Sequence, residues 1–266
     1  MRTKRCLIGQ WTAALLGALL GSALLISCAS LPSGQKNNEK DPSYQYNMGL
    51  VYLNSKGADE AALDRAISYF LKAVSLNAKH FLAYNALGLA YSMKGDLASA
   101  TRVFEKSLEI NPSFSEARNN LGNLFEALGF LDKAEAEYKK VLDDNTYRSR
   151  QLPLYNLARL AYRQDKLDEA LDYVDRSIRF DSRMAMAHNL RGLILEKKED
   201  LEGAVASYEK AGRLVPDDMS FQLNLGLALI KAGNAGEARR VLEAILHKTD
   251  NTELRQKASE ALKQLK

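Results

Sequence analysis

Residues 121–138, LGNLFEALGFLDKAEAEY, carry the pattern that decides the fold. Gly122 follows a leucine, Ala134 comes twelve residues later, and the bulky Tyr138 comes four residues after that. The same order of small and large residues recurs along the chain at spacings of 34, 36, 34 and 34 residues. A fixed period of this length is typical of proteins built from stacked copies of one supersecondary unit. The small residues that mark these copies are Gly88, Gly122, Ala158, Gly192 and Gly226.

Two other positions repeat with the same period. Alanine stands at one of them and a large residue at the other. An earlier copy of the pattern contains Gly49 and Phe70, and its turn, over 55–65, is longer. We expect each copy to be a pair of antiparallel helices. The small residues would let the two helices approach, and the large ones would fill the space between neighbouring pairs. The repeated pairs are Ala100 and Phe104, Ala134 and Tyr138, Ala170 and Val174, Ala204 and Tyr208, and Ala238 and Leu242.

The pattern resembles the tetratricopeptide (TPR) repeat, whose period and order of small and large residues it follows. The resemblance covers nearly everything after residue 41. It implies an all-α, superhelical solenoid of about six repeats, with a capping helix over 253–266. We number the repeats from one to six in the order 42–80, 81–114, 115–148, 151–184, 185–218 and 219–252.

The start of the chain follows the order of a secretory signal. Arg2, Lys4 and Arg5 precede an apolar run over 11–26, and a small residue stands before Cys28. The run is shorter than the roughly 20 residues that span a bilayer, which disfavours a membrane-spanning helix. A cleaved signal that leaves the cysteine unmodified is another alternative.

Residues 25–28, LISC, resemble the lipobox of bacterial lipoproteins. The resemblance implies that residues 1–27 are a signal peptide and that Cys28 becomes a lipid-carrying N-terminus, with no other cofactor. Ala29 stands where an Asp would retain such a lipoprotein at the inner membrane. We therefore expect a lipid anchor in the outer membrane, with the repeats facing the periplasm. The polar stretch 28–41 would be the tether.

The charge balance argues against nucleic acid as a partner. The chain has 37 basic and 33 acidic residues, and the segment before Cys28 contains three of the basic ones. Its removal leaves 34 basic against 33 acidic residues, a net charge of only +1. The histidines and cysteines form none of the common catalytic or metal-binding motifs, so we expect a protein that is not an enzyme.

The first helices of a TPR stack line its concave groove, and asparagine recurs at the groove positions. An amide side chain both donates and accepts hydrogen bonds, which suits contact with an extended peptide backbone. The alternative is that these amides satisfy helix ends or neighbouring side chains. The asparagines concerned are Asn47, Asn85, Asn119, Asn120, Asn123, Asn156, Asn189 and Asn224.

The predicted groove is not uniform. The second repeat is apolar around Leu89, whereas the fourth is basic and aromatic through Arg159, Tyr162 and Arg163. An apolar segment of a partner could dock early in the stack and an acidic one later. The alternative is that Leu89 and Tyr162 pack against neighbouring repeats.

The combination of lipobox, tether and six repeats resembles the type IV pilus pilotin group, which includes PilF, PilW and Tgl. Residues 144–150, DNTYRSR, followed by Tyr155-Asn156-Leu157, are similar to an insertion in that family. The resemblance implies a non-enzymatic assembly factor that binds a secretin subunit and promotes its localisation or multimerisation at the outer membrane. The alternative is an adaptor for peptidoglycan hydrolases or synthases, like the NlpI-like lipoproteins.

Overall fold

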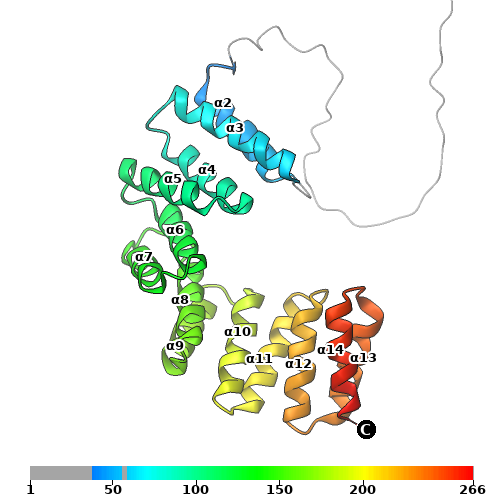
Figure 1. The fold of residues 1–266 in the computed structure, drawn as a ribbon. Helices are drawn as coiled ribbons and strands as arrows, with labels where there is room; N and C mark the ends of the chain where they lie inside the picture. Colours follow the sequence, from blue (N-terminus) through cyan, green and yellow to red (C-terminus); the bar gives the residue numbers. More distant parts are fainter. Residues whose placement is uncertain (1–37, 56–58, 266) are drawn as a thin grey trace, which may run out of the picture.

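The computed structural model describes residues 38–55 and 59–265, which form thirteen helices and no strand (Figure 1). The predicted signal peptide over 1–27, Cys28 and the tether up to residue 37 lie outside the described residues. None of the described helices is long and apolar enough to cross a membrane. The prediction of an all-α solenoid is confirmed.

The helices follow one another as antiparallel pairs, which succeed each other along a curved path (Figure 1). The first helices of the pairs are α2 (Pro42–Leu53), α4 (Phe81–Lys94), α6 (Ser115–Ala127), α8 (Gln151–Arg163), α10 (Ala185–Lys197) and α12 (Met219–Lys231). The second helices are α3 (Glu60–Leu76), α5 (Leu97–Ile110), α7 (Leu131–Asp143), α9 (Leu167–Phe180), α11 (Leu201–Leu214) and α13 (Ala235–Lys248). The last helix, α14 (Thr252–Lys263), packs against α12 and α13 at the end of the stack.

The long turn of the first repeat is shorter than the sequence suggested. We expected it over 55–65, but α3 already begins at Glu60. The Asp59 carboxylate accepts a hydrogen bond from the Ala62 amide at 2.8 Å and caps the helix. An acidic residue in the first turn, Glu60, adds a favourable interaction with the helix dipole. The first repeat is longer than the others, and part of its additional length therefore belongs to α3 and only part to the turn.

A contact between a small and a large residue holds each pair together. A Cβ atom added to Gly122 would lie 2.5 Å from the Tyr138 ring, so only glycine fits beneath it. In the fourth repeat, Ala158 replaces the glycine, and the facing residue is Val174, which is smaller than the aromatic residues at this position. Both side chains are fully buried. The large residues thus pack over the small residue of their own repeat, as well as between repeats as predicted. The same contact joins Gly49 with Phe70, Gly88 with Phe104, Gly192 with Tyr208 and Gly226 with Leu242.

The turn between the two helices of a repeat requires a left-handed residue. In the second repeat this is Gly95, with φ of 83°. The equivalent residues of the fourth and fifth repeats are Asp165 and Glu199, with φ of 62° and 65°. A side chain in this conformation costs free energy that glycine does not. Sequence analysis missed this position, because the residue type is not constant.

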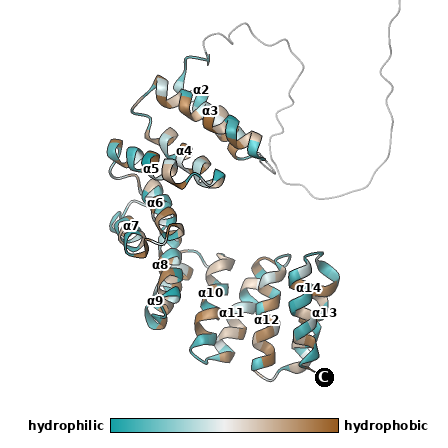
Figure 2. Ribbon diagram, in the orientation of Figure 1, coloured by the Kyte–Doolittle hydropathy of each residue, from teal (hydrophilic) through white to brown (hydrophobic). Residues whose placement is uncertain are grey.

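Hydropathy follows the pairing of the helices (Figure 2). The second helices each carry an apolar stripe and a polar one, and their apolar stripes pack against the first helices within and between pairs. Burial of these stripes forms a series of local clusters along the stack, such as those around Phe70, Phe104, Tyr138 and Tyr208. The residues on the outer side of each second helix can therefore vary without disturbing the core.

Candidate functional site

The first helices form the inner side of the curve. Neighbouring first helices pack directly on one another: α2 with α4, α4 with α6, α6 with α8 and α8 with α10. Their side chains therefore line one continuous surface, and all the predicted groove residues belong to the first helices. We call this surface the inner face.

Two asparagine pairs bridge neighbouring repeats on the inner face. The Asn120 amide donates to the Asn85 side-chain oxygen at 3.0 Å, and Asn224 donates to Asn189 at 2.8 Å. In both pairs the partners are 35 residues apart. These amides therefore hydrogen-bond to neighbouring side chains, which was the alternative to peptide contact.

A third amide group lies deeper between the third and fourth repeats. The Asn156 amide donates to Asn119 at 3.2 Å and to Asn123 at 2.9 Å. Asn119 and Asn156 are each only 7% exposed, so a partner cannot reach them without opening this junction. In this structure they tie the repeats together, which favours the alternative to peptide contact. Asn123 and Asn47 are exposed and remain available on the surface.

An apolar pocket of about 190 Å³ opens on the inner face between α4 and α6. Three of the predicted site residues, Leu89, Asn120 and Asn123, lie in its wall. Leu89 also packs against the core around Phe104, as the alternative expected, and its contact with a partner stays a prediction. A pocket with an apolar floor and amide groups at its rim suits a single apolar side chain on an extended chain. The remaining lining residues are Ser92, Leu97, Phe104, Leu124 and Ala127.

The basic patch predicted in the fourth repeat is paired with a carboxylate. Arg159 and Arg163 donate to the two oxygens of Glu126 at 2.7 and 2.8 Å. Glu126 is 7% exposed and belongs to the third repeat, so the ion pairs bridge the two repeats. The cationic surface that we expected for an acidic segment is therefore partly neutralised. Tyr162 packs against the core of the fourth repeat, with the Lys197 ammonium 5.2 Å from its ring centre.

The surroundings of Glu126 favour its charged form. Burial alone would raise its pKa, but the hydrogen bond and charge of Arg159, with Arg163 and Tyr138, outweigh burial and hold the pKa below its ordinary value. The Tyr138 hydroxyl donates to Asn123 at 2.8 Å and to Glu126 at 3.2 Å. Burial and the nearby carboxylate raise the pKa of Tyr138. Glu126 therefore stays ionised near neutral pH, and its ion pairs with Arg159 and Arg163 hold the third and fourth repeats together. We call this cluster the clamp.

A similar carboxylate–phenol pair recurs within the fifth repeat, and a lysine of the sixth repeat bonds to it. The Tyr208 hydroxyl donates to Glu196 at 2.8 Å, and Lys231 pairs with the same carboxylate at 2.5 Å. Sequence analysis missed both clusters, although the signal was present. A Glu stands twelve residues before the Tyr in each, and the two copies are 70 residues apart.

The insertion over 144–150 forms a compact corner between α7 and α8. Arg150 donates to the backbone oxygens of Asp144 at 3.0 Å and Leu142 at 2.8 Å, and Tyr147 is 8% exposed. Hydrogen bonds from Thr146 and Ser115 lower the pKa of the Asp144 carboxyl to about 2. The insertion thus fixes the start of α6 and leads the chain into the fourth repeat.

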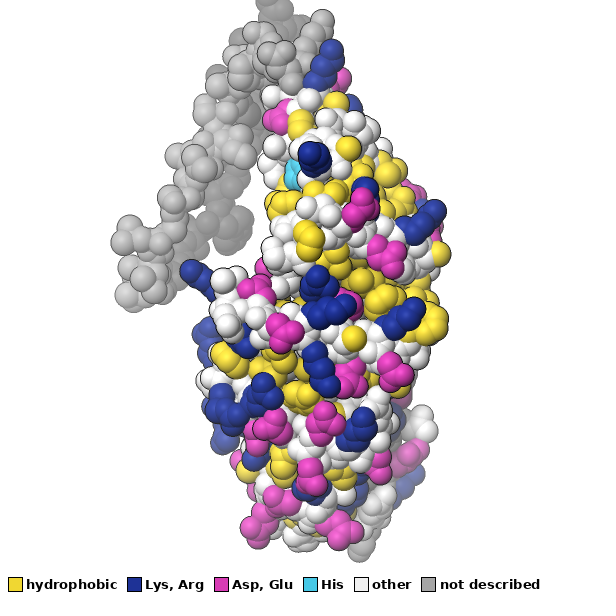
Figure 3. All heavy atoms as spheres, turned by 90° about the vertical axis from the view of Figure 1, so that its left-hand side faces the viewer, with side chains coloured by type: hydrophobic (Ala, Val, Ile, Leu, Met, Phe, Trp, Pro, Cys, Tyr) yellow, Lys and Arg dark blue, Asp and Glu magenta, His cyan; other side chains and the backbone are white. Residues whose placement is uncertain are grey.

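The surface is more apolar near the amino-terminal repeats. In Figure 3, hydrophobic side chains gather over the upper half of the face shown, and side chains of both charges are scattered below. Val51, Met93 and Phe130 are each more than half exposed. Within the described residues, no three His, Cys, Asp or Glu side chains gather in a way that could hold a metal ion.

Solved structures share this fold. PilF of Pseudomonas aeruginosa superposes with a TM-score of 0.72 at 15% identity, covering 84% of this chain and 99% of PilF. PilW, described as a widely conserved type IV pilus biogenesis factor, superposes with a TM-score of 0.73 at 19% identity, covering 81% of this chain and 96% of PilW. At this level of identity the likeness is one of fold.

Sequence comparison points to the same repeat. A BBSome complex member of Bos taurus is 26% identical over 215 residues, or 80% of this chain, which spans only 39% of that relative. Family models described as tetratricopeptide repeat match residues 81–114, 119–185, 155–218 and 195–263. Together with the six helix pairs, these matches show that the chain belongs to the tetratricopeptide repeat family.

Proposed function

We propose that this chain is a protein-binding adaptor in type IV pilus biogenesis. It would be held at the outer membrane by a lipid on Cys28, bind a secretin subunit, and promote the localisation or multimerisation of that subunit. The observation that carries this proposal is the likeness of fold to PilF and PilW over 99% and 96% of their chains. PilF and PilW therefore match this chain over nearly their whole lengths.

The proposed partner segment lies extended along the inner face. One apolar side chain enters the pocket beside Leu89, and the backbone bonds to the exposed amide of Asn123. The clamp at Glu126 holds the third and fourth repeats in one orientation, so this surface is preformed. A rigid surface lowers the entropy that binding costs.

The test uses capture from solubilised membranes by the full chain. Ala127 lines the pocket and is exposed, so Ala127→Glu places a charge in the pocket without disturbing the core. Ala235→Glu, on exposed α13, is the matched control. We expect the wild-type chain and the control to capture secretin and Ala127→Glu to lose about tenfold in affinity. Capture of peptidoglycan enzymes without secretin would contradict the proposal.

The membrane anchor is tested separately. Cys28→Ala should leave a folded chain that still binds secretin in solution, because the described repeats do not involve this residue. In cells the variant should no longer bring secretin to the outer membrane, which fractionation would detect. Full secretin assembly with Cys28→Ala would show that the anchor is not needed.

A further inference from the structure

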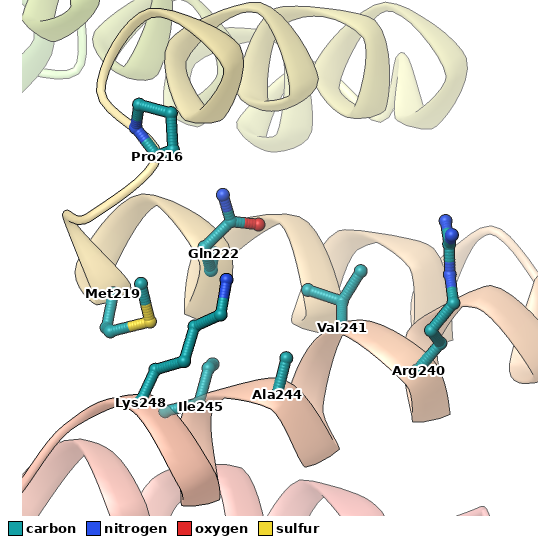
Figure 4. A pocket seen from close by; sticks show the side chains of 8 residues that line it. All are labelled: Pro216, Met219, Gln222, Arg240, Val241, Ala244, Ile245 and Lys248. Carbon is teal, nitrogen blue, oxygen red and sulfur yellow. The ribbon is translucent and has the colours of Figure 1, made fainter. Parts of the chain in front are cut away.

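A second pocket lies on the side of the second helices, away from the inner face (Figure 4). It has a volume of about 240 Å³ and lies between the start of α12 and the outer side of α13. Its floor is apolar, and Met219 and Ile245 are 6% and 0% exposed. Figure 4 shows Arg240 and Lys248 at opposite ends of the row of α13 side chains. The other lining residues are Pro216, Gln222, Val241 and Ala244.

Gln222 of this pocket packs against a glycine in α11, at a position where the second to fourth and sixth repeats have a large residue. A Cβ atom at Gly212 would lie 2.7 Å from the Gln222 amide nitrogen, so the amide occupies the space of the missing side chain. Glycine inside a helix costs about 1 kcal/mol relative to alanine. At this junction an amide therefore takes the place that an apolar side chain holds in the second to fourth and sixth repeats. The residues at the equivalent position are Leu108, Leu142, Ile178 and Leu246, and each packs against a core cluster.

Both ionisable side chains that line the pocket are cations, while Asp217 and Asp218 lie beside Met219 and Lys248 in an adjoining pocket. Lys248 takes part in no ion pair among the described residues. Arg240 is 78% exposed and has only a surface contact with Glu237 at 3.1 Å. On the adjoining α11, Arg213 is also 69% exposed. Asp218, the nearest acid in the chain before α12, already accepts hydrogen bonds from Ser220 as the cap of that helix.

We propose that this pocket binds an acidic segment of a partner protein, with one apolar side chain in the pocket and carboxylates on either side. The argument rests on charge complementarity, since Arg240 and Lys248 flank an apolar floor. The chain's own amino-terminal segment does not suit the site, because residues 1–38 contain four cations and no carboxylate. The proposal is independent of the inner-face site.

The spacing of the two cations defines the ligand. They are eight residues apart on one helix, which is roughly 12 Å along its axis. An extended chain covers this distance in about four residues. The preferred segment therefore carries acidic residues about two positions before and two positions after the apolar one. The Gln222 amide can bond to the backbone between them.

The test measures binding of fluorescein-labelled peptides to the full chain by fluorescence polarisation. The probe is Gly-Asp-Glu-Leu-Glu-Asp-Gly, and its control replaces every acidic residue with lysine. Two variants address the pocket: Ala244→Phe fills it, and Lys248→Glu reverses a charge at an exposed position. We expect each variant to weaken binding of the acidic peptide about tenfold, and Ala127→Glu on the inner face to leave it unchanged.

Several results would overturn the proposal. These are equal binding of the acidic and lysine peptides, or acidic-peptide affinity that neither pocket variant changes. Lys248→Glu keeps the test decisive if Ala244→Phe fails to fold. Binding to phosphatidylglycerol vesicles in place of the peptide, lost in Lys248→Glu, would assign the cations to a membrane surface. A dimer in sedimentation that Lys248→Glu dissociates would assign the pocket to a second copy of this chain.

Discussion

The junction of the third and fourth repeats differs from that of the fifth and sixth, although both use the same core contact. At the first junction, Glu126 is 7% exposed and bound by two arginines, with a buried asparagine group beside it. At the second, Glu196 is 21% exposed and pairs with Lys231, which is 57% exposed. The first junction is closed on its inner face, whereas the second has an open pocket on its outer side.

The difference shows how one repeat pattern can serve two purposes. The glycine and the tyrosine fix how the helices of a pair lie, and they are the same in the third and fifth repeats. The residues around them vary and decide whether a junction is clamped or open.

The aromatic contact should matter equally at both junctions. Tyr138 and Tyr208 are each fully buried, so Tyr138→Ala and Tyr208→Ala should each cost roughly 3–5 kcal/mol in the free energy of unfolding. Urea unfolding followed by circular dichroism would measure the loss. A cost below about 1 kcal/mol for either variant would contradict the account.

Loss of the Glu126 carboxylate should lower the free energy of unfolding more than loss of the Glu196 carboxylate. Glu126→Ala removes the shared acceptor of Arg159 and Arg163 and leaves the Tyr138 hydroxyl with Asn123 alone, and should cost about 2 kcal/mol. Glu196→Ala removes a more exposed pair and should cost less than about 1 kcal/mol. The same urea titration compares them. Equal losses would mean that the two junctions are clamped alike.

The clamp at Glu126 should also depend on pH. Its pKa is lowered in the folded chain, so its contribution is present above the unfolded pKa of about 4.3 and is lost as the pH falls through the folded value. The stability difference between wild type and Glu126→Gln should therefore be full at pH 7 and shrink below about pH 4. Thermal melts across this range measure it, with Glu243→Gln as an exposed control. A difference that does not vary with pH would rule out this explanation.

The smallest effect concerns the left-handed turns. Glu199→Gly, in the fifth repeat, should raise the free energy of unfolding by about 0.5 kcal/mol, since glycine relieves the strain but loses chain entropy. Asp165→Gly should gain less, because it also removes the ion pair with Lys197. Calorimetry would compare the melting temperatures. A lower melting temperature for Glu199→Gly would mean that the turn is not strained.

The fold was predictable from the sequence because it depends on a few positions that repeat. Gly122, Ala134 and Tyr138 have copies at a fixed period, and each copy confirms the others. The turn residue at Glu199 escaped notice because glycine, aspartate and glutamate all occur there. The start of α3 was misplaced, since the cap at Asp59 is a local signal within an irregular repeat.

The site was predictable only in part. Periodicity placed Leu89 and Asn123 on the inner face, where the structure finds a pocket. It could not reveal that Asn156 is buried, or that Glu126 pairs with Arg159, because these contacts join residues 33 positions apart. Contacts across a junction depend on how repeats stack, and a single repeat pattern does not contain that information.

The central claim is that a partner binds on the inner face of the second to fourth repeats. Hydrogen exchange of the full chain, measured by mass spectrometry with and without purified secretin subunit, tests it most directly. We expect slower exchange in α4, α6 and α8 when the secretin is bound, and no change in α11 and α13. Protection confined to α11 and α13, or no protection at all, would contradict the account.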